Sequence, residues 1–448
     1  MRAARNIYKN DVDFMALSLQ SPEFAKYLKP NGQLDFTDPD AVRQLTKSLL
    51  KQDFDLEVDI PENRLCPPVP NRLNYILWLQ DLLDTTGDEY RDDYDPDRDV
   101  TGLDMYFSVE QDAAVSIPFW DAPRGQGGSS WPQVSNDALC VGSEAHKSDI
   151  DDENIETATK TVTRNGLESR IQIIKTDPSS ELIPLQKSGV ERLDFTMCNP
   201  PFYASRDEMI TSAEAKERLP FSACTGAEVE MVTSGGELDF VTRMIEESIR
   251  LGEKVLWYTT MLGKLSSVSV IVEKLISHNN RNYAVTEFVQ GSKTRRWAVA
   301  WSWTDLRPAM NVARGITSFP KHLLPFPSES TFLISNASID DLCSKLDTEL
   351  SALPIQWHWR KNLSTGIGFA KENVWSRQAR RKIQNPETAE KHKMEIDEGQ
   401  AALGFKVQLK LDGIEETRTK VVMRWLKGTD SVLFESFVGM LKRKLEGR

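Results

Sequence analysis

The chain has 448 residues, enough for two or three domains, and its 40% hydrophobic and 27% charged residues are typical of an ordinary globular protein. No apolar run approaches the roughly 20 residues of a membrane span, and MRAARNIYKNDVDF has no apolar core, so we expect neither a membrane segment nor a secretory signal. The five cysteines are scattered without a CxxC pair and the five histidines are dispersed, which favours a reducing compartment and argues against disulfides or a metal site.

The net charge is −12 at pH 7, which taken alone argues against a nucleic-acid partner, because binding phosphates requires local positive charge. The basic residues are nevertheless gathered in short clusters, while much of the acid lies in 87–99 and 148–154. The clusters are Arg2, Arg5 and Lys9; Lys293, Arg295 and Arg296; Arg360 and Lys361; and Arg377, Arg380, Arg381 and Lys382. Each cluster fits a solvated face as well as a nucleic-acid surface, and the sequence leaves both open.

The first 303 residues are predicted to alternate helices and strands after a polar, helical start. The helix over 41–54 has Asp38 or Asp40 as its N-cap. The predicted elements are helices over 41–54, 71–83, 151–165, 235–252 and 267–278, and strands over 100–105, 170–175, 193–198, 254–262, 282–291 and 295–303. This alternation indicates an α/β fold with a doubly wound sheet.

Residues 305–329 are rich in proline and serine and are predicted to be a linker. The remainder, 330–448, has a pattern of its own, which indicates a separate small α+β domain. Its predicted elements are a strand over 331–335, a helix over 338–353, strands over 355–359, 405–411 and 420–426, and a helix over 431–445, with a charged loop over 383–404.

A buried strand over 193–198 runs directly into Asn199-Pro200-Pro201-Phe202, an order that suits methylation of the amino group of a planar base. The exocyclic amine of adenine is a poor nucleophile, because its lone pair is delocalised into the ring. The Asn199 side-chain oxygen and the Pro200 carbonyl can accept its two N–H groups and aim the lone pair at a sulfonium methyl group. The two prolines hold that carbonyl outward, and Phe202 offers a face for an extruded base.

Asn-Pro is also a common turn pair, so a plain strand-to-turn segment is the competing interpretation of this motif. Its position after a buried strand, together with the aromatic Phe202, favours the catalytic interpretation. Asn199, Pro200, Pro201 and Phe202 are therefore the predicted catalytic residues.

Besides this motif, several longer stretches of the sequence resemble those of a known protein family. They are ARNIYKN, FTDPDAVRQLTKSLLKQDFDLEVDIPENRLCPPVPNRLNYILW, TMCNPPF, GGELDFVTRMI, WYTTMLGK and TEFVQGSKTRRWAVAWS, and together they cover most of residues 1–303. In these stretches the chain resembles the methyltransferase-like-sixteen family of eukaryotes, which modifies U6 small nuclear RNA. That family is related to bacterial large-subunit ribosomal RNA adenine-N6 methyltransferases.

The resemblance implies a Rossmann-like class I methyltransferase sheet, with an N-terminal helical RNA-binding module at 1–75 and a methyltransferase domain at 76–304. The α+β domain at 330–448 takes the place of the family's C-terminal RNA-binding region, with little residue-level similarity. The implied cofactor is S-adenosyl-L-methionine, and the implied partner is structured RNA, above all U6 small nuclear RNA. No metal and no membrane are implied, and the expected location is the nucleus, with the cytoplasm second.

The resemblance also assigns binding residues. For the cofactor they are Arg72, Asp104, Asp149, Ser180 and Asn199. Asp149 stands where an acidic residue holds ribose hydroxyls, whereas Arg72, judged without the family, is a surface ion pair. For the RNA backbone they are Arg2, Arg5, Lys9, Arg295 and Arg296.

The sequence departs from the family pattern after the strand over 100–105. The pattern requires Asp-Ile-Gly-x-Gly, because the backbone must approach the cofactor closely, but the chain reads Asp104-Met105-Tyr106-Phe107-Ser108. In a frame shifted by two bases, 109–133 can encode GTGCSSIYPLLGCAQRPRWKFVAT, which supplies a glycine loop, a helix and a strand. We therefore expect 105–148 to be mistranslated, with VSNDALCVGSEAHKS as translated intron, and the chain as given to be inactive for want of the loop.

Other interpretations stay open. The chain can be a catalytically dead RNA-binding protein that keeps the methyltransferase fold, or a family member with an unusual loop. Its substrate can be ribosomal RNA. A protein amide or DNA is a further possibility, because NPP-aromatic motifs serve several amino substrates, but the N-terminal match to an RNA family argues against it.

Overall fold

The computed structural model shows two compact units. The first comprises Met1–Asp81, Tyr94–Trp303 and Gly315–Leu323, and the second comprises Leu82–Asp93, Thr304–Arg314 and Leu324–Arg448. The structure describes residues 6–62, 64, 66, 69–87, 90, 98–105, 143–149, 151–177, 179–214, 231–290, 294–335, 337–376, 378–379, 397–412 and 418–447. The RNA-binding candidates Arg2 and Arg5 and the segment 106–142, which holds most of the anomalous stretch, lie outside the described residues.

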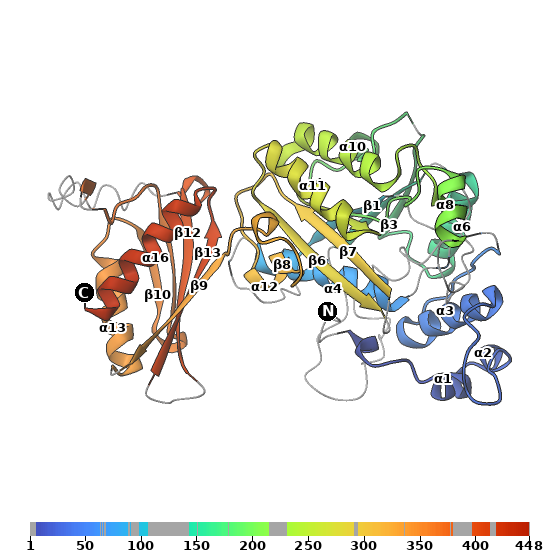
Figure 1. The fold of residues 1–448 in the computed structure, drawn as a ribbon, viewed down its shortest axis with the longest axis horizontal. Helices are drawn as coiled ribbons and strands as arrows, with labels where there is room; N and C mark the ends of the chain where they lie inside the picture. Colours follow the sequence, from blue (N-terminus) through green and yellow to red (C-terminus); the bar gives the residue numbers. More distant parts are fainter. Residues whose placement is uncertain are drawn as a thin grey trace. The chain divides into compact units, whose positions relative to one another are not determined.

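The first unit is built on an eight-stranded sheet in the order β3-β2-β1-β4-β5-β7-β6-β8 (Figure 1). The first five strands run parallel, and β7 is antiparallel to both β5 and β6. The strands are β1 (Val100–Met105), β2 (Ser143–Asp149), β3 (Ile171–Lys175), β4 (Leu193–Cys198), β5 (Val255–Leu262), β6 (Tyr283–Gln290), β7 (Thr294–Trp301) and β8 (Arg314–Gly315). The predicted doubly wound sheet is confirmed, and β1 and β4 lie side by side where the strand order reverses, the usual place for a ligand.

Helices cover both faces of this sheet. Tyr258 and Thr259 are neighbours in β5, so their side chains point to opposite faces. The Tyr258 hydroxyl donates to Gly252 O, just after α10 (Gly236–Leu251), at 2.9 Å. The Thr259 hydroxyl lies 2.7 Å from that of Tyr75 in α4 (Val69–Thr85). The unit also contains η1 (Ile7–Lys9), α1 (Phe14–Gln20), α2 (Pro22–Ala25), α3 (Pro39–Phe54), α6 (Asp152–Arg164), α7 (Leu185–Ser188), α8 (Arg206–Glu214), η2 (Gly252–Lys254), α11 (Leu265–Ser277) and η3 (Lys321–Leu323).

The start of the chain is tied to α3 and α4. Asn6 Nδ2 donates to Asn74 Oδ1 at 2.8 Å, and the Tyr8 hydroxyl donates to Asp53 at 2.6 Å, with Asn6 and Tyr8 both buried. Asp38 is the N-cap of α3, because its carboxylate accepts a first-turn backbone N–H at 2.9 Å. The described helices of 1–75 therefore cluster with the eight-stranded sheet in one unit.

The strand β2 was not expected from the sequence. It pairs in parallel with β1, where Lys147 lies opposite Asp104, and with β3, where Asp149 lies opposite Lys175. No strand is predicted from the sequence between 106 and 169, and the structure adds this one at 143–149. Two parallel neighbours can impose an extended backbone on a polar segment with weak strand propensity, since the ladder uses backbone groups alone.

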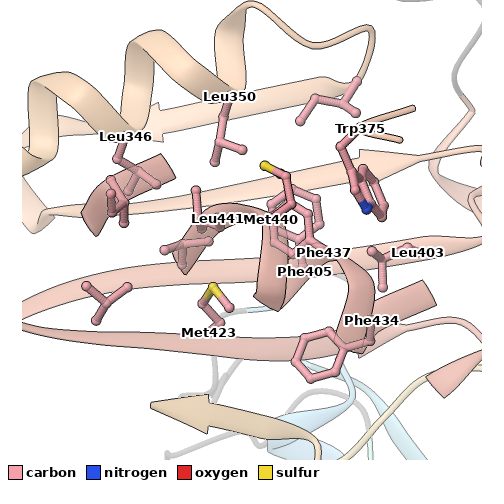
Figure 2. Packing of buried hydrophobic residues seen from close by; sticks show 14 of the residues in the cluster. Leu346, Leu350, Trp375, Leu403, Phe405, Met423, Phe434, Phe437, Met440 and Leu441 are labelled. Carbon is pink, nitrogen blue, oxygen red and sulfur yellow. The ribbon is translucent and has the colours of Figure 1, made fainter. Parts of the chain in front are cut away.

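The second unit contains a five-stranded antiparallel sheet in the order β10-β11-β12-β13-β9, with α13 and α16 on one face (Figure 1). Its elements are α12 (Met310–Ala313), β9 (Glu329–Ser335), α13 (Ile339–Ser351), β10 (Gln356–Arg360), η4 (Lys361–Leu363), β11 (Thr365–Ala370), η5 (Glu398–Gln400), β12 (Leu403–Leu411), β13 (Arg418–Lys427) and α16 (Ser431–Glu446). Figure 2 shows the core, where Leu346 and Leu350 of α13 and Phe437 of α16 pack with Phe405 of the sheet. This arrangement confirms the predicted small α+β domain.

The strand β11, which lies between β10 and β12, is missing from the sequence prediction, because it contains two glycines and looks like a turn. A Cβ on Gly366 would lie 2.3 Å from Trp357, and one on Gly368 would lie 2.4 Å from Phe405. The glycines therefore make room for aromatic rings that lie across the strand. Local propensity cannot show this, since the rings come from other strands.

The segment 305–329 differs from the expected linker. Arg307 Nε donates to Gly428 O at 2.8 Å, and the Arg307 guanidinium lies 4.3 Å from the Trp425 ring centroid. Lys427 forms an ion pair with Asp305 at 2.6 Å. Residues 304–314 and 324–329 thus belong to the second unit, while 315–323 belongs to the first.

Candidate functional site

The carboxyl ends of the parallel strands gather the candidate residues at one edge of the sheet. Asp104 lies near the end of β1 opposite Met197 of β4, and Asn199 directly follows β4. Asp149 is the last residue of β2; its side chain lies outside the described residues. Asp104 is 5% exposed, so this edge contains a buried acidic residue whose backbone lies opposite Met197, two residues before Asn199.

The NPPF motif leaves β4 with a fixed direction. Pro200 and Pro201 are buried, while Asn199 and Phe202 are half-buried and can reach a ligand. The next residue, Tyr203, donates its N–H to Met231 O at 3.0 Å and accepts from Thr233 N at 2.9 Å. These two backbone bonds hold the segment that follows the motif against the chain that leads into α10.

The start of α10 packs directly against the motif. Gly235 and Gly236 have φ of 73° and 65°, which favours glycine, and a Cβ on Gly236 would lie 3.3 Å from Ala204 N. The next residue, Glu237, is 3% exposed and accepts the Gly263 N–H at 2.7 Å through Oε2. Its Oε1 has no hydrogen-bond partner among the described residues.

Arg296 belongs to this site and Arg295 does not. The Arg296 guanidinium lies 5.4 Å from the Phe202 ring centroid, and its Nη1 donates to Arg295 O at 3.0 Å. Burial lowers the pKa of Arg296, as does the nearby charge of Arg72, while Tyr203 and Glu237 act in the opposite direction. Because neighbouring residues of a strand point to opposite faces, Arg295 lies on the other face of β7, where it pairs with Glu287 at 2.7 Å.

Arg72 is buried, with 3% of its surface exposed, so its interpretation as a surface ion pair is wrong. It lies in α4, one turn from Tyr75, close enough to Arg296 for its charge to affect that residue. Lys9, by contrast, is exposed, at the end of η1.

Ser180 follows β3 at the same edge of the sheet. Its hydroxyl donates to Asp177 Oδ2 at 2.7 Å and its N–H donates to Asp177 O at 2.9 Å, so both of its donors are used locally. Hydrogen bonds from Ser179 and Ser180 lower the pKa of Asp177. The helix α10 holds this loop, because Glu247 Oε2 accepts from Leu182 N at 2.8 Å.

Three buried residues near this edge were missed by the sequence analysis. Arg64 forms ion pairs with Asp151, at 2.9 Å, and Glu153, just after β2. Glu237 and Tyr75 lie in GGELDF and PNRLNYI, two of the stretches that resemble the family. Their place in those stretches was the signal that could have identified them.

In the parts of the chain that the structure describes, no helix is long and apolar enough to cross a membrane. Within the same parts, no group of three His, Cys, Asp or Glu side chains is arranged to hold a metal ion.

The sequence matches the profile of a family described as RNA methyltransferase over residues 2–105 and 139–305. The second matched stretch begins at residue 139. That is ahead of residue 148, the position at which we expect the reading frame to return. The chain is 34% identical to the U6 small nuclear RNA (adenine-(43)-N(6))-methyltransferase of Schizosaccharomyces pombe, over 93% of this chain and 96% of that protein. A match to the human RNA N(6)-adenosine-methyltransferase METTL16 covers 50% of that protein's length.

Solved structures show the same fold. The catalytic domain of human METTL16 in complex with MAT2A 3′UTR hairpin 6 has a TM-score of 0.54 and 32% identity, over 68% of this chain and 98% of that one. The N-terminal domain of human METTL16 in complex with SAH has a TM-score of 0.51 and 33% identity, over 67% and 98%.

Proposed function

Because this chain belongs to the RNA methyltransferase family that includes these U6 and METTL16 enzymes, we propose that it transfers a methyl group from S-adenosyl-L-methionine to N6 of an adenosine in structured RNA. The observation on which the proposal rests is the NPPF motif at the carboxyl end of β4, half-open at Asn199 and Phe202, beside the buried Asp104. A flipped adenine is the ligand class that such a set of acceptors and an aromatic face recognises.

The target amine is held by two acceptors. The Asn199 side-chain oxygen and the Pro200 carbonyl accept its two N–H groups, which directs the lone pair away from the ring plane and toward the methyl donor. Phe202 stacks on the base. Arg296 above Phe202 keeps its charge next to the base and is placed to contact a flanking phosphate.

The residues at the carboxyl edge of the sheet carry polar groups that suit those of S-adenosyl-L-methionine. The buried Asp104 and the acid at Asp149 are suited to its amino and ribose hydroxyl groups, and Asn199 lies between cofactor and base. Arg72 is placed to balance the carboxylate, and Ser180 offers its hydroxyl oxygen as an acceptor. When bound, the cofactor supplies an electrophilic methyl group on a positively charged sulfur.

The finer assignments follow the relatives. The substrate is U6 small nuclear RNA, which places the protein in the nucleus. Residues 1–75 and Lys9, with Arg2 and Arg5, hold the RNA backbone, while 76–304 forms the methyltransferase domain and 330–448 an accessory domain. Of the basic strand, Arg296 faces the base and Arg295 lies on the opposite face, so we assign the larger share of RNA binding to Arg296.

The test is a calorimetric titration of the full chain with S-adenosylhomocysteine, followed by transfer of labelled methyl to a U6 hairpin, a ribosomal hairpin and a DNA hairpin. We expect the full chain to bind the cofactor and to label adenosine N6 of the U6 hairpin only. A second protein, with 105–148 replaced by the frame-corrected loop, runs beside it. Binding by the frame-corrected protein alone would instead bear out the inactivity expected from the missing glycine loop. If neither protein binds the cofactor, the enzyme proposal is wrong and a catalytically dead RNA-binding protein takes its place. If the ribosomal hairpin alone is labelled, the U6 assignment is wrong.

A further inference from the structure

The hydroxyl of Tyr75 lies at the point where β4 separates from β5. Tyr75 is fully buried in α4, and its hydroxyl accepts the Cys198 N–H at 3.3 Å. The same hydroxyl lies 2.7 Å from Thr259 Oγ1, and Thr259 Oγ1 donates to Thr196 O at 2.7 Å. Three segments far apart in the sequence thus meet at the last residue before the NPPF motif.

The hydrogens in this cluster can be assigned from the contacts. The Thr259 hydroxyl has one hydrogen, which goes to Thr196 O, so Thr259 must accept at its contact with Tyr75. Tyr75 then donates to Thr259, and its oxygen is free to accept from Cys198 N. The result is one directed chain, from Cys198 N–H through Tyr75 and Thr259 to Thr196 C=O. Such chains polarise their members and strengthen them.

This chain of hydrogen bonds continues from the point where the β4–β5 ladder ends. The pairing between β4 and β5 stops at Thr196 opposite Tyr258, two residues short of the end of β4. The β4–β5 register does not extend to Cys198, whose buried N–H still requires a hydrogen-bond acceptor. The Tyr75 hydroxyl supplies it, with Cys198 O a further 3.5 Å contact. The direction in which Asn199 and Pro200 leave the sheet is therefore set from α4.

We propose that Tyr75 is a positioning residue for methyl transfer, whose hydroxyl clamps the end of β4 and so aims the Asn199 oxygen and the Pro200 carbonyl at the amine. The inference rests on the proposed function for its catalytic consequence, but not for its geometry. Burial raises the pKa of Tyr75, so the phenol keeps the hydrogen that the chain requires.

Four variants of the full chain test this inference. Tyr75→Phe removes the hydroxyl and keeps the ring, and Thr259→Val breaks the next link, while Thr259→Ser retains it. Tyr258→Phe is the matched control, because Tyr258 is also fully buried and its hydroxyl also bonds to a backbone carbonyl, at 2.9 Å, on the opposite face of β5.

We expect Tyr75→Phe and Thr259→Val to lower kcat roughly 10- to 100-fold, because misplacement of a reacting group by up to about 1 Å has that effect. The Kd for S-adenosylhomocysteine and for the RNA hairpin should stay within about twofold, and Thr259→Ser and Tyr258→Phe should keep kcat within about twofold of the wild type. A kcat for Tyr75→Phe close to the wild-type value, or an equal loss in Tyr258→Phe, would overturn the inference.

Hydrogen exchange at the Cys198 amide separates this inference from the proposed function, since it requires no activity. Loss of its partner should speed exchange about 5- to 100-fold in Tyr75→Phe and Thr259→Val, but not in Tyr258→Phe. If the wild type methylates no RNA and this exchange still rises, the proposed function fails and the clamp stands. If the exchange is unchanged, the clamp is refuted whatever the activity.

Discussion

Replacing Gly263 by alanine should damage catalysis more than folding. Gly263 follows β5, and a Cβ there would lie 3.0 Å from Phe202 Cδ1 and 3.3 Å from Glu237 Oε2. Carbon atoms prefer separations of about 3.5 to 4.0 Å, so the Phe202 ring must retreat by roughly 0.5 to 1 Å. Phe202 is half-buried and can move, so the stability cost should be near the lower end of the overpacking range, about 1 kcal/mol.

The catalytic effect should be larger, because Phe202 is the stacking surface that we propose for the base. A shift of this size should lower kcat by about 10-fold, and at most by about 100-fold. The assay is steady-state transfer of tritiated methyl to an RNA hairpin, with thermal unfolding measured on the same samples. Tm should fall by only about 2 to 4 °C.

The matched control is Gly439→Ala in α16. A Cβ at Gly439 would meet Arg443 Nη1 at an ordinary 3.5 Å, so alanine should stabilise the helix by up to about 1 kcal/mol and leave kcat unchanged. If Gly263→Ala retains kcat within about twofold, the contact between position 263 and the base-stacking ring does not govern catalysis. If it loses cofactor binding and unfolds far earlier, the damage is global and the reasoning fails as well.

Arg296→Ala should weaken RNA binding by at least about two- to fivefold through loss of the proposed contact with a flanking phosphate, and should reduce the salt dependence of binding by about one charge. Asp177→Asn should raise hydrogen exchange in the loop after β3. Hydrogen bonds depress the pKa of Asp177, so the contribution of its carboxylate to the stability of the loop is fully present above about pH 4. That contribution is lost only as the pH falls through the lower pKa of the folded state. The protection of the loop amides against exchange should therefore not vary between pH 5 and 8. Gly368→Ala should destabilise the second unit by about 1 to 3 kcal/mol, because its Cβ would lie 2.4 Å from the buried Phe405.

Each of these outcomes has a control or a contrary result. Arg295→Ala should change RNA affinity less than Arg296→Ala, since Arg295 pairs with Glu287 on the other face; an equal effect would contradict the assignment of faces. Protection of the Asp177 loop that declines steadily from pH 8 to 5 would show that another group controls it. For Gly368→Ala, the measurement is the thermal unfolding transition of the second unit by calorimetry. An unchanged transition would mean that Phe405 repacks freely.

Much of the first unit could be predicted from local patterns. The strand over 193–198 was predicted with the bounds that the structure shows, and in the second unit the helix predicted over 338–353 corresponds to α13. Asp38 caps α3 as one of the two residues named for that role. In each case the signal comes from residues that are a few positions apart in the sequence, because side-chain periodicity and helix capping depend on such near neighbours.

Local sequence patterns were therefore enough to predict the α/β order of the first unit and the position of the NPPF motif after a buried strand. Which side chains meet at the motif depends on how the strands and helices pack: Arg296 rather than Arg295 lies over Phe202, and Tyr75 clamps the end of β4. The tertiary structure also decided that a polar segment becomes β2 and a glycine-rich one becomes β11. The physical reason is that local propensity describes neighbours along the chain, whereas pleat direction, ladder ends and ring clearance depend on strands that are distant in sequence and adjacent in space.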